Sequence, residues 1–507
     1  MLHHPVYDLL VVGGGINGVG IALDAAGRGL RVLLCEMNDL GSATSSNSSK
    51  LIHGGLRYLE YYHFRLVREA LAEREVLLKK APHIIQPLRF RLPHMPHLRP
   101  AWMIRVGLFL YDHLSRRTTL PASHAIRFNA HSPLAADLTH GFEYSDGWVD
   151  DARLVILNAL AAQQHGTAIY PRTRCIAAKR HGDHWQVTLQ NQRDLRIWQV
   201  RCRVLVNATG PWVNQLFTCA LQRPSPQPVR LVKGSHILLP RLHDQPEAYI
   251  LQHNDQRIVF VIPFEERFSL VGTTDEEYHG DPAEVSIADT EIDYLLALVN
   301  RYFKHQSTRD QIVGAFSGVR PLLDDLSNAA HAVSRDYHFE LDAPPNEAVL
   351  LSVFGGKITT YRKLAEAALQ RLRPFFPAMG PDWTQHAALP GGDFEHPDQL
   401  LLALRNAYPW LPEPLARRWV RSYGTLSHQL LDGADRLEAL GRHFGAGLYQ
   451  REVDYLIEQE WAQTLDDILW RRTKLRLQLS TEQQQQLGHY LRQRRAVRET
   501  FPSDPAA

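Results

Sequence analysis

A glycine-rich turn close to the start of the chain is the feature that most constrains its fold. The apolar run Tyr7–Val12 leads directly into Gly13-Gly14-Gly15-Ile16-Asn17-Gly18, and a second apolar run, 31–35, ends at Glu36. This order of strand, glycine turn, helix, strand and acid is typical of the unit that holds the diphosphate and ribose of a dinucleotide. We therefore predict an α/β fold with a Rossmann-like domain at the start, and a helix over residues 16–28.

The residues of this unit have separate physical roles. Gly13 makes the tight turn, Gly15 lets the backbone approach a phosphate, and Gly18 lets the helix pack closely on the strand. The start of the helix, which includes Asn17, would direct free N–H groups and a positive dipole end at the diphosphate. Glu36 is expected to accept hydrogen bonds from a ribose diol.

Length and composition limit the classes of protein to consider. A chain of 507 residues is too long for one hydrophobic core, so we expect two or three domains. The 56 basic residues barely outnumber the 54 acidic ones, and this balance gives no indication of a nucleic-acid partner. No run of about 18 apolar residues is present, so no membrane-spanning helix is expected. The four cysteines lack CxxC spacing and the 26 histidines form no HxxxH or HExxH pair with a carboxylate, so we predict free thiols and no metal site.

Two further glycine turns indicate which dinucleotide is bound. The apolar run 204–206 leads into Asn207-Ala208-Thr209-Gly210, and the run 349–353 leads into Phe354-Gly355-Gly356-Lys357 and another helical pattern. The start of that last helix would place N–H groups at the electron-rich edge of a reduced flavin. A nicotinamide enzyme needs only the first unit, whereas three turns that converge on one extended ligand predict FAD.

The remaining patterns divide the chain into further regions. Alternating β-type segments in 226–344, together with the Pro- and Arg-rich segment 81–144, predict a β-rich substrate-binding (cap) domain. Helical spacing of Leu, Arg and Gln over 390–495 predicts a C-terminal all-helical domain, followed by a tail at 496–507. We expect the FAD-binding domain to be discontinuous, over residues 1–80, 145–225 and 345–375.

Several segments resemble the FAD-dependent glycerol-3-phosphate dehydrogenases, and in particular the aerobic, quinone-linked bacterial branch of that family. The segments that carry the resemblance are Gly13–Gly18, Ser48–Leu59, Asn207–Trp212, Lys233–His236, Gly272–Asp275, Ser317–Pro321 and Phe354–Lys363. The resemblance weakens after about residue 390, where Ala462–Thr473 still resembles the C-terminal helical domain of the family. It implies oxidation of sn-glycerol 3-phosphate to dihydroxyacetone phosphate by hydride transfer to flavin N5, and electron transfer to ubiquinone.

The resemblance also implies which residues form the site. Arg57, Tyr58, Thr274, Arg335 and Lys357 are expected around glycerol 3-phosphate, since the planar fork of arginine suits a phosphate. For Arg335 a simple ion pair with the adjacent Asp336 is the alternative. FAD contacts are expected from Gly13, Gly15, Asn17, Gly18, Glu36, Thr44, Ser45, Lys50, Leu51, His53, Gly54, Ala208, Gly210, Gly356, Lys357 and Thr359.

Oxidation at C2 also removes a hydroxyl proton, and a neutral imidazole is a suitable acceptor near pH 7. We predict that His236 is the catalytic base, with His53 as the second candidate. The alternative for His53 is a hydrogen-bonded group that packs beside the flavin. Arg320 is expected to stabilise the developing alkoxide by its charge.

Basic and apolar residues are interleaved between Arg89 and Arg117, and the only acid there is Asp112. Such a segment suits the headgroup layer of an anionic membrane, but a core helix with snorkelling arginines gives the same pattern. The resemblance favours membrane docking. We therefore expect a peripheral, monotopic homodimer at the cytoplasmic face of the inner membrane, with some protein in the cytoplasm.

Two other functions are compatible with the glycine turns. An amine or amino-acid flavin oxidase has the same architecture, but it would hold a carboxylate with as few as one arginine. A non-catalytic FAD-bound protein would need the turns but not Arg57, His236 and Arg320. The number of cations in the matching segments favours a phosphate ester.

Overall fold

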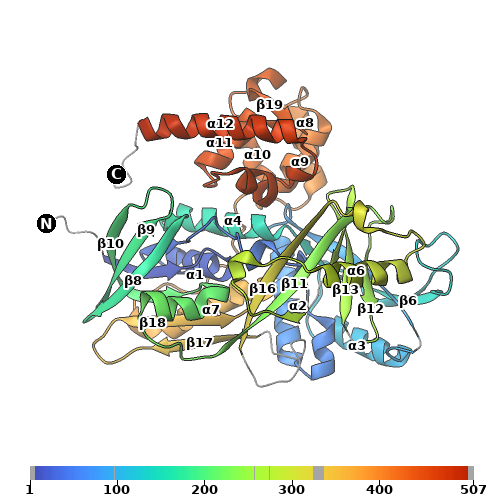
Figure 1. Ribbon diagram of the computed structural model, residues 1–507, viewed down its shortest axis with the longest axis horizontal. Coiled ribbons are helices and arrows are strands. Elements are labelled where there is room, and N and C mark those ends of the chain that lie inside the picture. The colour runs from blue at the N-terminus through green and yellow to red at the C-terminus, as the bar shows by residue number, and fades with distance from the viewer. Residues whose placement is uncertain (1–5, 96, 256, 273–274, 324–335, 501–507) are drawn as a thin grey trace. The chain divides into compact units, whose positions relative to one another are not determined.

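The first glycine turn lies between a strand and a helix in the computed structural model (Figure 1). β1 (Val6–Val12) precedes the turn, α1 (Ile16–Gly27) follows it, and β2 (Val32–Cys35) pairs with β1 in parallel. All four residues of β2 are buried, as its apolar sequence predicts. The Rossmann-like unit is therefore confirmed, with α1 ending one residue before the predicted limit.

The structure describes residues 6–95, 97–255, 257–272, 275–323 and 336–500. The chain divides into two units, of which the first comprises residues 1–80 and 85–387. The second comprises residues 81–84 and 388–507. The finer domain boundaries predicted within the first unit stay predictions.

The first sheet brings the three glycine turns to one edge. Its main path has the order β17 (Tyr337–Asp342), β18 (Val349–Gly355), β10 (Ile197–Asn207), β1, β2 and β7 (Ala168–Tyr170), and β8 (Thr173–His181) and β9 (His184–Asn191) extend it from β10. β1, β10 and β18 are parallel neighbours, so the turns that follow them lie side by side at their carboxyl ends. β17 falls in the segment predicted for the substrate-binding domain, but it pairs with β18 in this sheet.

Helices cover the first sheet. α1 packs against α4 (Asp151–Gln164) and α7 (Tyr361–Leu372). A further helix, α2, spans Phe64–Lys80. α4 is buried from its first residue to Ala162, as expected for a helix enclosed in the core. The sequence pattern predicts helices over residues 64–80 and 151–164, and α2 and α4 have these bounds.

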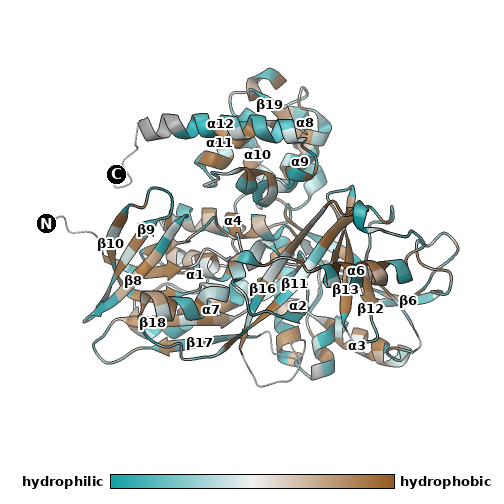
Figure 2. Ribbon diagram, viewed as in Figure 1, coloured by the Kyte–Doolittle hydropathy of each residue, from teal (hydrophilic) through white to brown (hydrophobic). Residues whose placement is uncertain are grey.

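The second sheet is the predicted β-rich region and is largely antiparallel. Its main path has the order β15 (Glu276–Glu277), β11 (Val229–Pro240), β14 (Phe268–Gly272), β13 (Ile258–Phe264), β12 (Ala248–Gln252), β4 (Ile85–Pro93), β6 (His140–Val149) and β3 (Leu51–Ile52). β16 (Gly314–Leu323) pairs with β11, and β5 (His124–Arg127) pairs with β6. β12 and β13 are hydrophobic over most of their length (Figure 2), and α6 (Asp289–Tyr302) packs on β11 and β12.

The second unit is mainly helical, which confirms the predicted C-terminal helical domain. Its helices are α8 (Pro397–Ala407), α9 (Glu413–Tyr423), α10 (Ser427–Leu431), α11 (Gln450–Glu458) and α12 (Thr481–Thr500), with a short hairpin of β19 (His443–Gly445) and β20 (Leu448–Tyr449). Trp419 and Leu456 lie fully buried in its core. The buried carboxylate of Glu452 accepts hydrogen bonds from Arg418, from Trp419 Nε1 (3.0 Å) and from the Tyr423 hydroxyl (2.7 Å), so its charge is fully compensated.

His243 makes the stability of the first unit sensitive to acid. Its ring is buried and stacks on Phe303 with centroids 5.9 Å apart, and burial and the nearby Arg241 lower its pKa to about 4. In the unfolded chain the pKa of histidine is about 6.5. Below pH 6.5 the unfolded state therefore takes up a proton that the folded state does not, and stability falls as the pH drops toward 4.

We expect His243→Phe to reduce this acid sensitivity, because phenylalanine keeps the stacked ring but does not titrate. At pH 5 the depressed pKa of one such histidine lowers stability by about 2 kcal/mol relative to pH 8. The measurement is the Tm of both proteins at pH 8 and pH 5. An equal drop in Tm for the two proteins would contradict the role of His243.

Candidate active site

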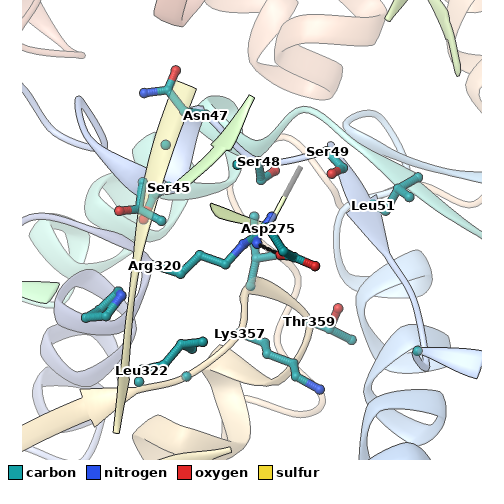
Figure 3. Close-up of a pocket in the computed structure, with 18 of the residues that line it drawn as sticks. Ser45, Asn47, Ser48, Ser49, Leu51, Asp275, Arg320, Leu322, Lys357 and Thr359 are labelled. Atoms are coloured by element: carbon teal, nitrogen blue, oxygen red, sulfur yellow. Dashed lines mark hydrogen bonds and ion pairs between the residues drawn. The ribbon is translucent and has the colours of Figure 1, made fainter. Parts of the chain in front are cut away.

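The three glycine turns open onto one cavity of about 1030 Å³ in the first unit. Residues of both sheets line it, and Figure 3 shows serine, asparagine and basic side chains around the same space. The residues that the turns contribute are Gly13, Gly15, Ala208, Thr209, Gly210, Gly355 and Gly356. A cavity of this size, lined by residues of both sheets, suits an extended ligand.

The first turn has room only for glycine. Gly13 has a φ of +114°, and a Cβ there would lie 2.4 Å from the carbonyl oxygen of Ala208. A Cβ on Gly18 would lie 1.9 Å from the carbonyl oxygen of Gly13. Gly18 does not line the cavity, so it serves the turn by letting α1 pack on it. The N–H of Ile16 donates to Ser45 Oγ (3.0 Å), which ties the polar loop after β2 to the start of α1.

Glu36 lines the cavity at the end of β2, as predicted. Its Oε2 accepts from the N–H of Gly14 (2.7 Å) and its Oε1 from the N–H of Asn38 (2.8 Å). Burial raises the pKa of Glu36, and these two N–H donors oppose that shift. A carboxylate has about four acceptor positions, so this one keeps capacity for the hydroxyls of a ribose.

Most of the residues predicted to bind the cofactor do line the cavity. They are Gly13, Gly15, Asn17, Glu36, Thr44, Ser45, Leu51, His53, Ala208, Gly210, Gly356, Lys357 and Thr359. Gly18, Lys50 and Gly54 do not. The buried ammonium of Lys50 donates to Asp151 (2.8 Å) and to the carbonyl of Ser46 (3.0 Å), and the N–H of Gly54 donates to the Tyr111 hydroxyl (2.7 Å). In the structure the Lys50 side chain and the Gly54 backbone therefore support the loop from behind the cavity wall.

A group of basic side chains faces the cavity beyond the glycine turns. Arg57 and Arg320 line it, and the ammonium of Lys357 lies 3.8 Å from the centre of the Tyr58 ring. Nε and Nη2 of Arg57 are buried and have no hydrogen-bond partner among the described residues. Burying such donors without a partner is costly, and the same edge of a guanidinium forms paired hydrogen bonds with a phosphate. The arrangement therefore provides an anion site.

Asp275, which was not among the predicted site residues, is also a member of this group. Its side chain is only 3% exposed and accepts a hydrogen bond from Nη1 of Arg320, drawn as a dashed line in Figure 3. Its other oxygen lies 3.9 Å from Nη1 of Arg57. The position of Asp275 after Gly272 in a matching segment was the available signal. Two other predicted substrate residues, Thr274 and Arg335, lie outside the described residues.

His236 lies behind the cavity wall and does not line it. Its ring is buried, stacks on Phe316 with centroids 4.9 Å apart, and places Nε2 3.0 Å from Ser49 Oγ, while Ser49 does line the cavity. Burial and the charges of Lys50 and Arg320 lower the pKa of His236 to about 3. The imidazole is thus neutral near pH 7 but is a weak proton acceptor, and the structure does not bring the predicted base into the cavity.

His53, the second candidate base, does line the cavity. Its backbone N–H donates to Thr359 Oγ1 (3.2 Å), and its ring lies edge-on to Phe260 with centroids 6.3 Å apart. This position agrees with either of the roles considered for His53. Within the described part of the chain no three His, Cys, Asp or Glu side chains are grouped so as to hold a metal ion.

Comparisons with known proteins agree with this geometry. The sequence profile of the FAD dependent oxidoreductase family matches residues 8–362, and that of the C-terminal domain of alpha-glycerophosphate oxidase matches residues 383–490. The chain is 55% identical to the aerobic glycerol-3-phosphate dehydrogenase of Escherichia coli strain K12, over 96% of this chain and 97% of that protein.

Two further relatives cover nearly the whole chain. The D-erythritol 1-phosphate dehydrogenase of Brucella abortus is 51% identical, over 93% of this chain and 95% of that protein. Among solved structures, a glycerol-3-phosphate dehydrogenase from Bacillus halodurans complexed with FAD superposes with a TM-score of 0.72 at 25% identity, over 96% of this chain and 94% of that one.

Proposed function

Since the chain belongs to the FAD-dependent glycerol-3-phosphate dehydrogenase family, we propose that it oxidises sn-glycerol 3-phosphate to dihydroxyacetone phosphate. FAD, held along the three glycine turns, supplies the acceptor for the hydride from C2. The observation that carries the proposal is the open edge of Arg57 beside Arg320 and Lys357, in the same cavity as those turns.

The cavity residues have distinct roles in this reaction. Arg57 and Lys357 bind the phosphate by charge-assisted hydrogen bonds, and Tyr58 packs under the ammonium of Lys357. Arg320 stabilises the negative charge that develops on the C2 oxygen. His236 fixes the orientation of the Ser49 hydroxyl from behind the wall, since its neutral ring lies within hydrogen-bond distance of that oxygen. Thr274 and Arg335 remain expected substrate contacts from the family resemblance.

The decisive test is anaerobic mixing of the FAD-loaded protein with sn-glycerol 3-phosphate while the visible flavin absorbance is followed. We expect the flavin to lose its colour and to recover it on addition of a soluble quinone, with little hydrogen peroxide formed in air. A flavin that stays oxidised under excess substrate would reject the proposal. Rapid peroxide formation would instead support the oxidase alternative.

A second substrate, D-erythritol 1-phosphate, is favoured by one observation, the 51% identity to a dehydrogenase of that name. Both substrates are phosphate monoesters of polyols, so the same anion site suits both. Flavin reduction rates measured with the two substrates under the same conditions would separate them. We expect the flavin to be reduced faster by glycerol 3-phosphate, because the aerobic glycerol-3-phosphate dehydrogenase is the more similar of the two relatives, at 55% identity.

We also propose that the protein docks on an anionic membrane through α3 (Ala101–His113). One face of α3 is buried through Ile104, Leu108 and Tyr111. Yet Trp102 is 68%, Val106 51% and Phe109 61% exposed, so apolar side chains lie on the outer face of the helix as well. An exposed apolar face of this kind suits the boundary between headgroups and acyl chains.

The charges of this region differ from the sequence-based expectation. Arg89 and Arg91 pair with Glu143 at 2.7 and 3.0 Å, and Arg99 pairs with Glu60. The arginines in these ion pairs do not bind lipid headgroups, because their charges are already compensated. Arg105 and Arg116 are exposed and have no ion pair with a described residue, so they are the arginines of the segment that remain for anionic headgroups.

The cavity reaches this helix. Met103, Val106, Gly107 and Leu110 of α3 line it, as do Tyr62 and Phe64. We therefore propose that ubiquinone reaches the flavin from the membrane along α3. From the family resemblance we further propose that the protein lies at the cytoplasmic face of the inner membrane. No helix in the described part of the chain is long and apolar enough to cross a bilayer. A homodimer remains an expectation from the family.

Replacing Trp102 and Phe109 together by serine is expected to abolish flotation with anionic vesicles and to leave flavin reduction by substrate within about twofold of the wild-type rate. The two rings supply most of the exposed aromatic area of the helix, and such side chains anchor proteins at the headgroup layer. Leu402→Ser is the matched control, because Leu402 is 60% exposed in the second unit. Flotation of the double variant at the wild-type level would contradict docking through α3.

A further inference from the structure

Asp275 is an acid inside a site that is built to hold an anion. It is almost fully buried, lies next to Arg57 and Arg320, and lines the same cavity (Figure 3). A carboxylate at this place repels a phosphate, so its presence requires a physical reason. We infer that Asp275 is a positioning residue that holds Arg57 and Arg320 in place and sets the charge of the anion site. This inference rests on the proposed function.

The first part of the reason is the repulsion between the two guanidinium groups. Asp275 Oδ1 accepts from Nη1 of Arg320, and Asp275 Oδ2 lies 3.9 Å from Nη1 of Arg57. One carboxylate therefore lies between two like charges that would otherwise move apart into solvent. Arg57 is 13% and Arg320 is 24% exposed, so both are held where the solvent screens them poorly.

The second part of the reason is the edge of the Arg57 guanidinium that Asp275 leaves open. The carboxylate approaches Nη1, whereas Nε and Nη2 have no partner among the described residues. The Nε–Nη2 edge presents two parallel donors, the geometry that matches two oxygens of a phosphate. Asp275 thus orients Arg57 from one side and does not compete for the donors that the substrate needs.

The third part of the reason is the net charge of the anion site. Arg57, Arg320 and Lys357 contribute three positive charges and Asp275 removes one, which leaves a formal charge of +2 on these four side chains. A phosphate monoester carries a charge near −2 above its second pKa of about 6. With the dianion bound the group is formally neutral, so no net charge of this group has to be buried in the complex.

For Asp275→Asn we expect different effects on substrate binding and on the rate of flavin reduction. Loss of one negative charge strengthens the attraction for anions, so the dissociation constant of glycerol 3-phosphate and the Ki of inorganic phosphate should stay within about threefold of wild type or fall. Nη1 of Arg320 loses its charged acceptor, so the guanidinium is less well positioned. A misplaced charge beside the reacting carbon should slow flavin reduction by about 30-fold to 100-fold. Asp275→Glu keeps the charge and should recover part of that rate.

The experiment is stopped-flow reduction of the FAD-loaded variants over a range of substrate concentrations, with inhibition by inorganic phosphate measured in parallel. Glu277→Gln is the matched control, since Glu277 is 43% exposed, pairs with Arg230 and does not line the cavity. It should reduce the flavin within about twofold of the wild-type rate, the scatter expected for a surface charge.

Three results would overturn the inference. The first is Asp275→Asn reducing its flavin at the wild-type rate, and the second is weaker binding of both anions with an unchanged limiting rate. The third is loss of FAD by Asp275→Asn, because a positioning role leaves the glycine turns intact. If the wild-type protein is not reduced by glycerol 3-phosphate, the proposed function fails instead, and that result is independent of Asp275.

Discussion

Arg57→Gln is expected to raise the KM for glycerol 3-phosphate by about 100-fold or more. The buried Nε and Nη2 of Arg57 are the open donors of the anion site, and two hydrogen bonds from a charged group contribute about 3 kcal/mol or more together. The substitution removes both of them and one positive charge. The measurement is the steady-state rate with a soluble electron acceptor over a wide range of substrate concentration.

Two variants make this result specific. Arg57→Lys keeps the charge but loses the paired donors, so its KM should lie between those of Arg57→Gln and wild type. Arg65→Gln removes an arginine that is 80% exposed and pairs with Asp336, and it should have little effect. The assignment of Arg57 to the phosphate would be wrong if Arg57→Gln and Arg65→Gln gave the same KM.

Gly18→Ala is expected to yield a protein that is purified largely without FAD. The added Cβ would lie 1.9 Å from the carbonyl oxygen of Gly13, a backbone atom that can move only if the turn opens. Opening the turn displaces the N–H groups at the start of α1 that we expect to bind the diphosphate. The ratio of visible flavin absorbance to protein absorbance measures the loss, and added FAD should restore little activity.

Gly488→Ala provides the control for a general effect of alanine in a helix. Gly488 lies in α12, and a Cβ there has its nearest neighbour, a methyl group of Leu465, at 3.5 Å. Alanine is a better helix former than glycine, so this variant should keep its FAD and be at least as stable as wild type. Wild-type FAD content in Gly18→Ala would show that the first turn tolerates a side chain.

Several features of the fold could be predicted because they depend on residues close together in the sequence. The glycine turn after β1, the burial of β2 and the limits of α2 and α4 follow from local periodicity and from the sparse conformations open to residues other than glycine. The same holds for Glu36, whose place at the end of β2 fixes its position relative to the turn.

The features that could not be predicted involve contacts between distant segments. Lys50 lies in a polar loop that suggested a cofactor contact, but Asp151, about a hundred positions later in the chain, takes its ammonium. Arg89 and Arg91 lie in a segment that suggested charges facing lipid, but both form ion pairs with Glu143 because β6 pairs with β4. The strand register of the second sheet decides these pairs, and a one-residue shift in register would turn each side chain to the other face.

In the site, too, local features could be predicted and contacts between distant segments could not. The sequence alone determined the three glycine turns after β1, β10 and β18, because each turn is a local arrangement with a steric requirement that few residues meet. Only the tertiary structure decided which polar groups face the cavity. It moved His236 behind Ser49, left one edge of Arg57 open, and placed Asp275 between two arginines. The direction in which a side chain points, and the charge it then faces, depend on how the two sheets pack, and no short segment contains that information.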